Sequence, residues 1–351
     1  MRTKTNTGRQ IELDIAKGFS VIFMVFSHVM LQFSSERVSD SLYSSIVDFF
    51  AGIPAAPVFM FMLGVGVIYS KKATAKTLAY RGVQVLCAGY ILNFFRSVLP
   101  VYINHLQGYT EYTSIFELFY DNFFYVDILQ FAGLAMLFLA LVLKFKLSHL
   151  NIICITLVFM GLNLILLPHM PRIENIWSTP LLSLVIGGAE TSYFPFLTWI
   201  VYPVSGYIFG SYLIQATDKR QFYAQLFKVT GPVLLLYLVG ILMMNFPTGY
   251  ENEALYYQHT ALINIIYILF VLWWLSFVYF ISQTFHLDKI AFIQTLSKNT
   301  NKIYYIHFIL IGVLLVYIHI RLEVLPIFIL SLVITLLSYF LSKKLPLNWL
   351  P

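Results

Sequence analysis

Charged residues are scarce in this chain. Only 11% of its 351 residues are Asp, Glu, Lys or Arg, whereas 59% are hydrophobic. An ordinary soluble domain has about 25% charged and about 45–50% apolar residues, and a globule of this size cannot hide so much apolar surface from water. The composition therefore excludes a soluble enzyme, a disordered protein, a coiled coil and a nucleic-acid-binding domain. It predicts a protein whose main solvent is lipid.

Cysteine is equally scarce. The two cysteines, Cys87 and Cys154, each lie inside an apolar run, which excludes a disulfide framework and a cysteine-based metal site. The sequence also lacks G-x-S-x-G, H-E-x-x-H, the P-loop and G-x-G-x-x-G. The histidines at positions 105, 149, 169, 259, 286 and 319 show no metal-ligand spacing, so we expect no metal cofactor.

Long apolar runs, by contrast, fill the chain. A helix needs roughly 20 mostly apolar residues to cross a membrane. Stretches that qualify lie at about 13–33, 44–69, 76–98, 124–143, 149–167, 195–215, 226–245, 260–283, 302–320 and 324–342. We predict an all-α polytopic membrane protein with about ten transmembrane helices, in a single integral-membrane domain over residues 1–351. No small-residue cleavage site follows the first run, which we interpret as a retained span rather than a signal peptide.

The placement of charge predicts the orientation. If both termini are cytoplasmic, most Lys and Arg residues fall on the inner side and most acidic residues outside, as the positive-inside rule requires. The longest outer segments then lie at about 99–123 and 168–194 and are rich in aromatic residues and proline. They could cover a site at the outer face or form an interfacial aromatic belt.

Three ionisable side chains lie in the first predicted span, where such groups are costly. At 100° per residue, Asp14, Lys17 and His28 fall on one stripe of a helix, which rises roughly 16 Å from Lys17 to His28. Asp14 and Lys17 could form an ordinary ion pair or take part in binding. His28 lies deep in the span and could be a helix–helix hydrogen-bond partner or a general base.

Further polar residues mark other spans. Lys71, Lys72 and Arg81 form a basic cluster near the predicted inner surface, suited either to phosphate groups or to anionic lipid head groups. Helix packing is the default interpretation for the remaining polar candidates, which are Asn93, Gln130 and His307.

The order of several short motifs resembles a known superfamily. Arg9–Met30 (RQIELDIAKGFSVIFMVFSHVM) resembles the first helix of membrane acyltransferases, with their L-D-x-x-R-G turn and, in the family-3 branch, a histidine farther along the helix. Here Lys17 takes the arginine's place, and His28 follows after ten intervening residues, where the histidine belongs. Acyltransferase family 3 and the heparan-alpha-glucosaminide N-acetyltransferase-like proteins are the two branches concerned. Further similar segments follow in order: PVFMFMLGVGV at 57–67, Arg81–Asn93, DILQFAGLAM at 127–136, FPFLTWIVYPVSGYIFG at 194–210 and NTNKIYYIH at 299–307.

This resemblance implies an acyl-CoA-dependent O- or N-acyltransferase in the cell membrane. It would move an acyl group, by family precedent acetyl, from cytoplasmic acetyl-CoA to a hydroxyl or amine of an extracytoplasmic sugar or envelope glycan. The resemblance implies His28 as the catalytic residue. The implied substrate-binding residues are Asp14, Lys17, Lys71, Lys72, Arg81, Asn93, Gln130 and His307. The alternatives are a transporter or flippase for a lipid-linked sugar, and a polytopic sensor or scaffold.

Overall fold

A computed structural model describes residues 4–172, 179–188, 192–250, 253–287 and 290–346. Its regular elements within these ranges are helices, and extended backbone pairs there in two isolated bridges, Ser34 with Leu322 and Val126 with Ser192. The predicted all-α fold class is confirmed. The predicted outer segment 168–194 lies partly outside the described residues.

The chain divides into two compact units that alternate along the sequence. Unit 1 comprises Met1–Leu13, Pro57–Cys87 and Val126–Phe285, and unit 2 comprises Asp14–Ala56, Ala88–Tyr125 and His286–Pro351. Three helices, α1 (Ile11–Phe33), α4 (Ala56–Tyr69) and α5 (Ala75–Asn93), contribute residues to both units. Each unit is described below by itself.

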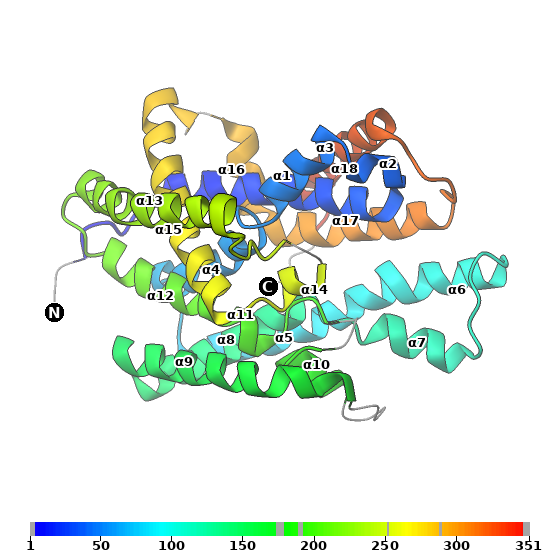
Figure 1. The fold of residues 1–351 in the computed structure, drawn as a ribbon, viewed down its shortest axis with the longest axis horizontal. Coiled ribbons are helices and arrows are strands. Elements are labelled where there is room, and N and C mark those ends of the chain that lie inside the picture. Colours follow the sequence, from blue (N-terminus) through cyan, green and yellow to red (C-terminus); the bar gives the residue numbers. More distant parts are fainter. Residues whose placement is uncertain (1–3, 173–178, 189–191, 251–252, 288–289, 347–351) are drawn as a thin grey trace. The chain divides into compact units, whose positions relative to one another are not determined.

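Unit 1 holds most of the long helices (Figure 1). Besides its parts of α1 and α5 it contains α4 (Ala56–Tyr69, all but its first residue), α8 (Ile128–Phe145), α9 (His149–Leu166), η2 (Leu167–Arg172), α10 (Thr179–Val185), α11 (Phe196–Trp199), α12 (Val201–Leu213), α13 (Lys219–Met244), α14 (Glu253–Tyr257) and α15 (Ala261–Phe285). Several of these helices begin where a side chain accepts a hydrogen bond from a backbone amide. Ser148 accepts one from the amide of Asn151 at 3.2 Å, and Asp218 from that of Gln221 at 2.9 Å.

Unit 2 is built around α1 and two helices near the end of the sequence. It contains α2 (Glu36–Ser39), α3 (Leu42–Ala51), the π-helix η1 (Phe94–Val98), α6 (Leu99–Leu106), α7 (Ile115–Phe123), α16 (Ala291–Lys298), α17 (Thr300–Leu315) and α18 (Val324–Lys344). Residues four apart on α1 present one apolar face, which packs in a buried cluster with α17 and α18: Val21, Val25, Val29 and Phe33 with Ile303, Ile311, Ile327 and Ile334. Figure 1 shows α17 beside α18, and α6 and α7 as a hairpin.

The membrane class rests on the length and surface of the helices. Eight of the ten predicted spans coincide with helices long and apolar enough to cross a membrane. On helix α13, the exposed fraction of each of four apolar residues lies between 61% and 79%: Leu235, Leu236, Leu242 and Met243. Such an apolar surface suits lipid far better than water. The chain is therefore a multi-pass membrane protein.

The other two predicted spans correspond to shorter helices. At 195–215 the chain forms the short α11 and then α12 of 13 residues, and at 302–320 it forms α17 of 16 residues. The third span is longer than predicted, because η1 and α6 extend it to Leu106. The count of about ten and the cytoplasmic termini therefore remain predictions.

Glycine brings α4 and α12 into backbone contact in unit 1. A Cβ atom added to Gly64 would lie 1.8 Å from the carbonyl oxygen of Pro203, and one added to Gly206 would lie 1.9 Å from that of Phe61. The neighbouring Gly66 has nothing within 4 Å of such a Cβ. Of the two glycines of the Gly64-Val65-Gly66 sequence, only Gly64 is thus required by this crossing.

We predict that Gly64→Ala destabilises the protein and that Gly66→Ala does not. The added methyl group in Gly64→Ala must push two backbones apart, which costs about 1–3 kcal/mol or more, whereas alanine at an open helical site is neutral or slightly favourable. Thermal melting of the purified variants in detergent measures the difference. Equal melting temperatures for the two variants would contradict the close crossing.

Candidate active site

The polar residues of α1 face the segment that begins with α16. The hydroxyl of Ser297 on α16 donates a hydrogen bond of 2.7 Å to Oδ1 of Asp14. One turn away, Gly18 lets α16 approach, since a Cβ there would lie 2.6 Å from Cγ2 and 2.9 Å from the carbonyl oxygen of Ile293. Lys17 is half-buried beside them and interacts electrostatically with Asp14. Asp14 is thus held by Ser297, and its ion pair with Lys17 remains a prediction.

Two histidines meet farther along the same helix. Nδ1 of His28 lies 2.9 Å from Nε2 of His307 on α17, and the two rings are almost parallel, with 6° between their planes. His307 is fully buried, and His28 is half-buried. The structure therefore brings together a histidine predicted to lie deep in the first span and a histidine for which helix packing was the default interpretation.

The partners of the two rings determine where their protons lie. Nδ1 of His307 lies 2.9 Å from the carbonyl oxygen of Ile303, and since a carbonyl only accepts hydrogen bonds, that nitrogen carries the proton. Nε2 of neutral His307 is then an acceptor, and Nδ1–H of His28 donates to it. In the neutral pair, the basic lone pair of His28 therefore lies on its Nε2.

Aromatic rings and one cation surround this pair. The Phe308 ring lies 4.4 Å from the His28 ring and 4.3 Å from the His307 ring, measured between centroids. On Phe308 also rests the guanidinium of Arg96, whose Cζ lies 4.3 Å from the ring centroid. Arg96 was not among the predicted site residues.

The predicted residue Asn93 holds the backbone next to Arg96. Its side-chain amide donates hydrogen bonds of 2.8 Å to the carbonyl oxygens of Phe123 and Tyr125, and its Oδ1 accepts one of 3.2 Å from Nε of Arg96. Asn93 is 1% exposed. Its contacts within unit 2 are therefore those of a residue that fixes Arg96 and the end of α7.

The remaining predicted residues belong to unit 1. Lys71 and Lys72 are exposed in the turn before α5, and Arg81 is exposed on α5 itself. Gln130 caps α8: its Oε1 accepts a hydrogen bond of 3.2 Å from the amide of Asp127, in a capping box with the Asp127 side chain. The amide nitrogen of Gln130 is buried and has no hydrogen-bond partner among the described residues.

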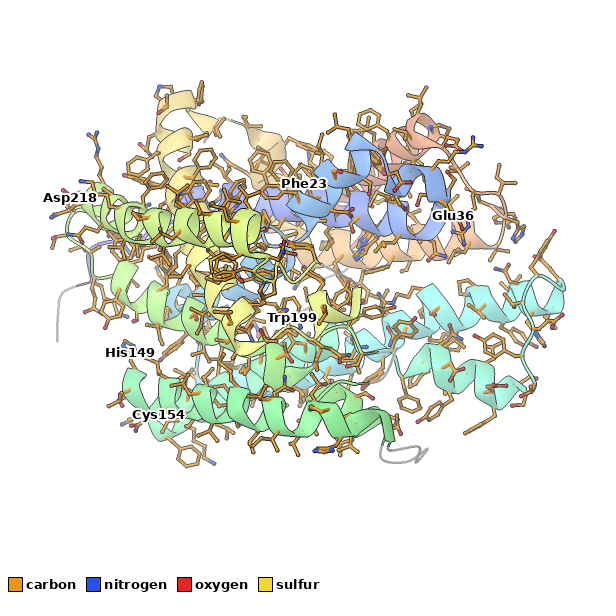
Figure 2. The ribbon with its side chains drawn as sticks, viewed as in Figure 1. Phe23, Glu36, His149, Cys154, Trp199 and Asp218 are labelled. Carbon is orange, nitrogen blue, oxygen red and sulfur yellow. The ribbon has the colours of Figure 1, made fainter. Side chains whose placement is uncertain are left out.

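A second buried histidine lies in unit 1 and was not predicted to be important. Nδ1 of His259 lies 2.7 Å from the carbonyl oxygen of Tyr256, and the Tyr202 hydroxyl and Oδ1 of Asn264 both lie 2.8 Å from its Nε2. Trp199, labelled in Figure 2, donates from Nε1 to the carbonyl oxygen of Tyr257 at 2.7 Å. The F-P-x-x-x-W-x-x-Y motif thus fastens the segment before α15 onto α11 and α12.

Among the residues that the structure describes, no group of three or more His, Cys, Asp or Glu side chains could hold a metal ion. The fold and the site together define a class of protein: a multi-pass helical membrane protein. Its unit 2 contains a hydrogen-bonded pair of histidines, and Phe308 contacts both these histidines and the cation Arg96.

Comparison with protein families then gives a more specific answer. A family model described as the catalytic domain of heparan-alpha-glucosaminide N-acetyltransferase matches residues 9–245, well over half of the chain. The chain therefore belongs to this family of membrane acetyltransferases. Of the two branches that the sequence resembles, the match supports the heparan-alpha-glucosaminide N-acetyltransferase branch and not acyltransferase family 3. The matched residues end before His307. A search of curated proteins found no match.

The buried histidine of unit 1 predicts a stability that depends on pH. Burial lowers the pKa of His259 from 6.5 to about 4, although its hydrogen bonds to Tyr256 and Asn264 partly offset this. Between these two pH values, His259 is protonated in the unfolded chain but neutral in the folded protein. The free energy of unfolding therefore falls as the pH falls from about 6.5 towards about 4.

We expect the melting temperature of the wild type in detergent to fall more steeply than that of His259→Gln between about pH 7.5 and about pH 5. The variant is less stable throughout, so the measured quantity is the difference between the two slopes. Parallel slopes would show that His259 is not buried in its neutral form.

Proposed function

We propose that this protein transfers an acetyl group from acetyl-CoA to an amine or hydroxyl of a sugar on the far side of the membrane, with His28 as the general base. The family supports acetyl transfer with acetyl-CoA as donor. The observation that carries the assignment of His28 is its hydrogen bond to His307, because that bond places the basic lone pair on a half-buried imidazole inside a membrane protein.

The proposed reaction uses the two protonation states of His28. The acceptor nitrogen or oxygen forms a bond to the thioester carbonyl carbon, the carbonyl electrons move to its oxygen, and the acceptor's proton passes to Nε2 of His28. The resulting imidazolium donates its Nδ1–H to His307, which stabilises the new charge. The carbon–sulfur bond then breaks, and the proton leaves with the CoA thiolate.

We infer the donor-binding residues from charge. Lys71, Lys72 and Arg81 lie exposed near the first turn of α5 and suit the CoA phosphates, while Asp14 orients Lys17 for the same purpose. Contact of Asn93 and Gln130 with substrate also remains a prediction. The buried amide nitrogen of Gln130 supports it for that residue, because a bound acceptor atom would satisfy it.

The function is tested with two acceptors that differ in one group. Purified protein in nanodiscs receives labelled acetyl-CoA and either 4-nitrophenyl α-glucosaminide, which offers an amine, or 4-nitrophenyl α-glucoside, which offers only hydroxyls. Acetylation of the first alone assigns N-acetylation, and acetylation of both assigns O-acetylation. A transporter or flippase would release no CoA with either acceptor.

We predict that His28→Ala lowers kcat by about 10²–10⁴-fold, the usual contribution of general-base catalysis. The matched control is His286→Asn, since His286 is an exposed histidine of the same unit in a left-handed conformation that asparagine tolerates. The rate of CoA release is the readout, and both variants should elute as monodisperse protein. A His28→Ala variant with the wild-type rate would remove His28 from the chemistry.

His307 acts by positioning His28, which gives a separate prediction. Phenylalanine at position 307 keeps a ring against Phe308 but removes the acceptor for Nδ1–H of His28, so His28 is no longer held in one tautomer. We expect His307→Phe to lower kcat by about 10²-fold or more with KM for acetyl-CoA little changed. A change confined to KM would instead place His307 in the donor-binding site.

A further inference from the structure

We propose that Arg96 is a second catalytic residue, whose guanidinium stabilises the oxyanion formed on the thioester carbonyl next to His28. This inference rests on the proposed function. It concerns a residue that neither the sequence motifs nor the family match singles out, and it is argued from contacts within unit 2.

Arg96 and the histidine pair share one aromatic neighbour. The Phe308 ring contacts both imidazoles, and the guanidinium lies 4.3 Å from the centre of the same ring. Cation–π contact holds a guanidinium parallel or nearly parallel to a ring at little cost in hydration. The guanidinium and both imidazoles thus lie against the same aromatic ring.

Three local features place Arg96 there. The chain forms a π-helix over Phe94–Val98, a distortion that is often found at functional sites. The absence of a side chain at Gly312 lets this π-helix approach α17, since a Cβ there would lie 3.1 Å from Cα and from the carbonyl oxygen of Arg96. The buried Asn93 accepts the hydrogen bond from Nε. A lipid-facing or snorkelling arginine would need none of these features.

The charge of Arg96 fits the proposed chemistry. Addition of the acceptor converts a neutral thioester carbonyl into an oxyanion, and the low-dielectric interior of a membrane protein makes that charge expensive without a nearby cation. A guanidinium is permanently charged and carries five N–H donors in a planar fork, a geometry that suits an oxyanion.

The test separates charge stabilisation from packing. Arg96→Gln removes the charge but keeps a polar side chain, Arg96→Ala opens space for an added guanidinium ion, and Arg96→Lys keeps the charge. Arg37→Gln is the matched control, because Arg37 is exposed on α2 of the same unit. Each full-length variant is assayed with acetyl-CoA and 4-nitrophenyl α-glucosaminide, or with the glucoside if the wild type prefers it.

We expect kcat to fall by about 10²–10³-fold in Arg96→Gln and Arg96→Ala, with KM for both substrates little changed. Guanidinium chloride, at concentrations that leave the wild-type rate unchanged, should restore part of the rate of Arg96→Ala. Arg37→Gln should match the wild type. If the first two variants do not fold, Arg96→Lys decides: the account expects a smaller loss, again in kcat, because an ammonium lacks the planar fork.

Three results would overturn the role of Arg96 alone: a wild-type kcat in Arg96→Gln, a loss confined to KM, or no rescue of folded Arg96→Ala by guanidinium. For Arg96→Lys, a lowered melting temperature with unchanged kcat would do the same. Absence of acetyl transfer by the wild type would instead overturn the proposed function, and the catalytic role of Arg96 with it.

Discussion

The proposed chemistry depends on one hydrogen bond, from Nδ1–H of His28 to Nε2 of His307. A neutral imidazole can present its lone pair on either nitrogen, and in a membrane interior the choice is made by its partners. Here the carbonyl oxygen of Ile303 fixes the tautomer of His307, and His307 in turn fixes that of His28. The backbone carbonyl of Ile303 on α17 thus determines, through the ring of His307, which nitrogen of the half-buried His28 on α1 carries the lone pair. Without it, His28 would be an ordinary polar residue in a helix interface.

Much of the fold could be predicted because lipid imposes strict rules. Apolar runs of about 20 residues have few alternatives to a spanning helix, and eight of the predicted stretches coincide with such helices. The runs at 195–215 and 302–320 are where this rule is weakest. Apolar composition does not reveal that a helix ends at Trp199 and another begins at Val201, or that α17 stops at Leu315.

The candidate site could be predicted only along single helices. Helical periodicity placed Asp14, Lys17 and His28 on one stripe, and contacts of α1 with α16 and α17 agree with it. The pairing of His28 with His307 joins residues 279 positions apart, and no local pattern records such a contact. Arg96 was missed because a π-helix and a distant glycine at 312 position it. Likewise, the tryptophan and tyrosine of the F-P-x-x-x-W-x-x-Y motif were visible, but their partners near His259 were not.

The central claim is that acetyl transfer takes place at Nε2 of His28. An experimental structure of the protein with a bound non-hydrolysable analogue of acetyl-CoA, in which a methylene group replaces the sulfur, tests this most directly. The account predicts the analogue's carbonyl carbon beside Nε2 of His28 and its carbonyl oxygen towards the Arg96 guanidinium. An analogue bound elsewhere, with its carbonyl touching neither residue, would contradict it.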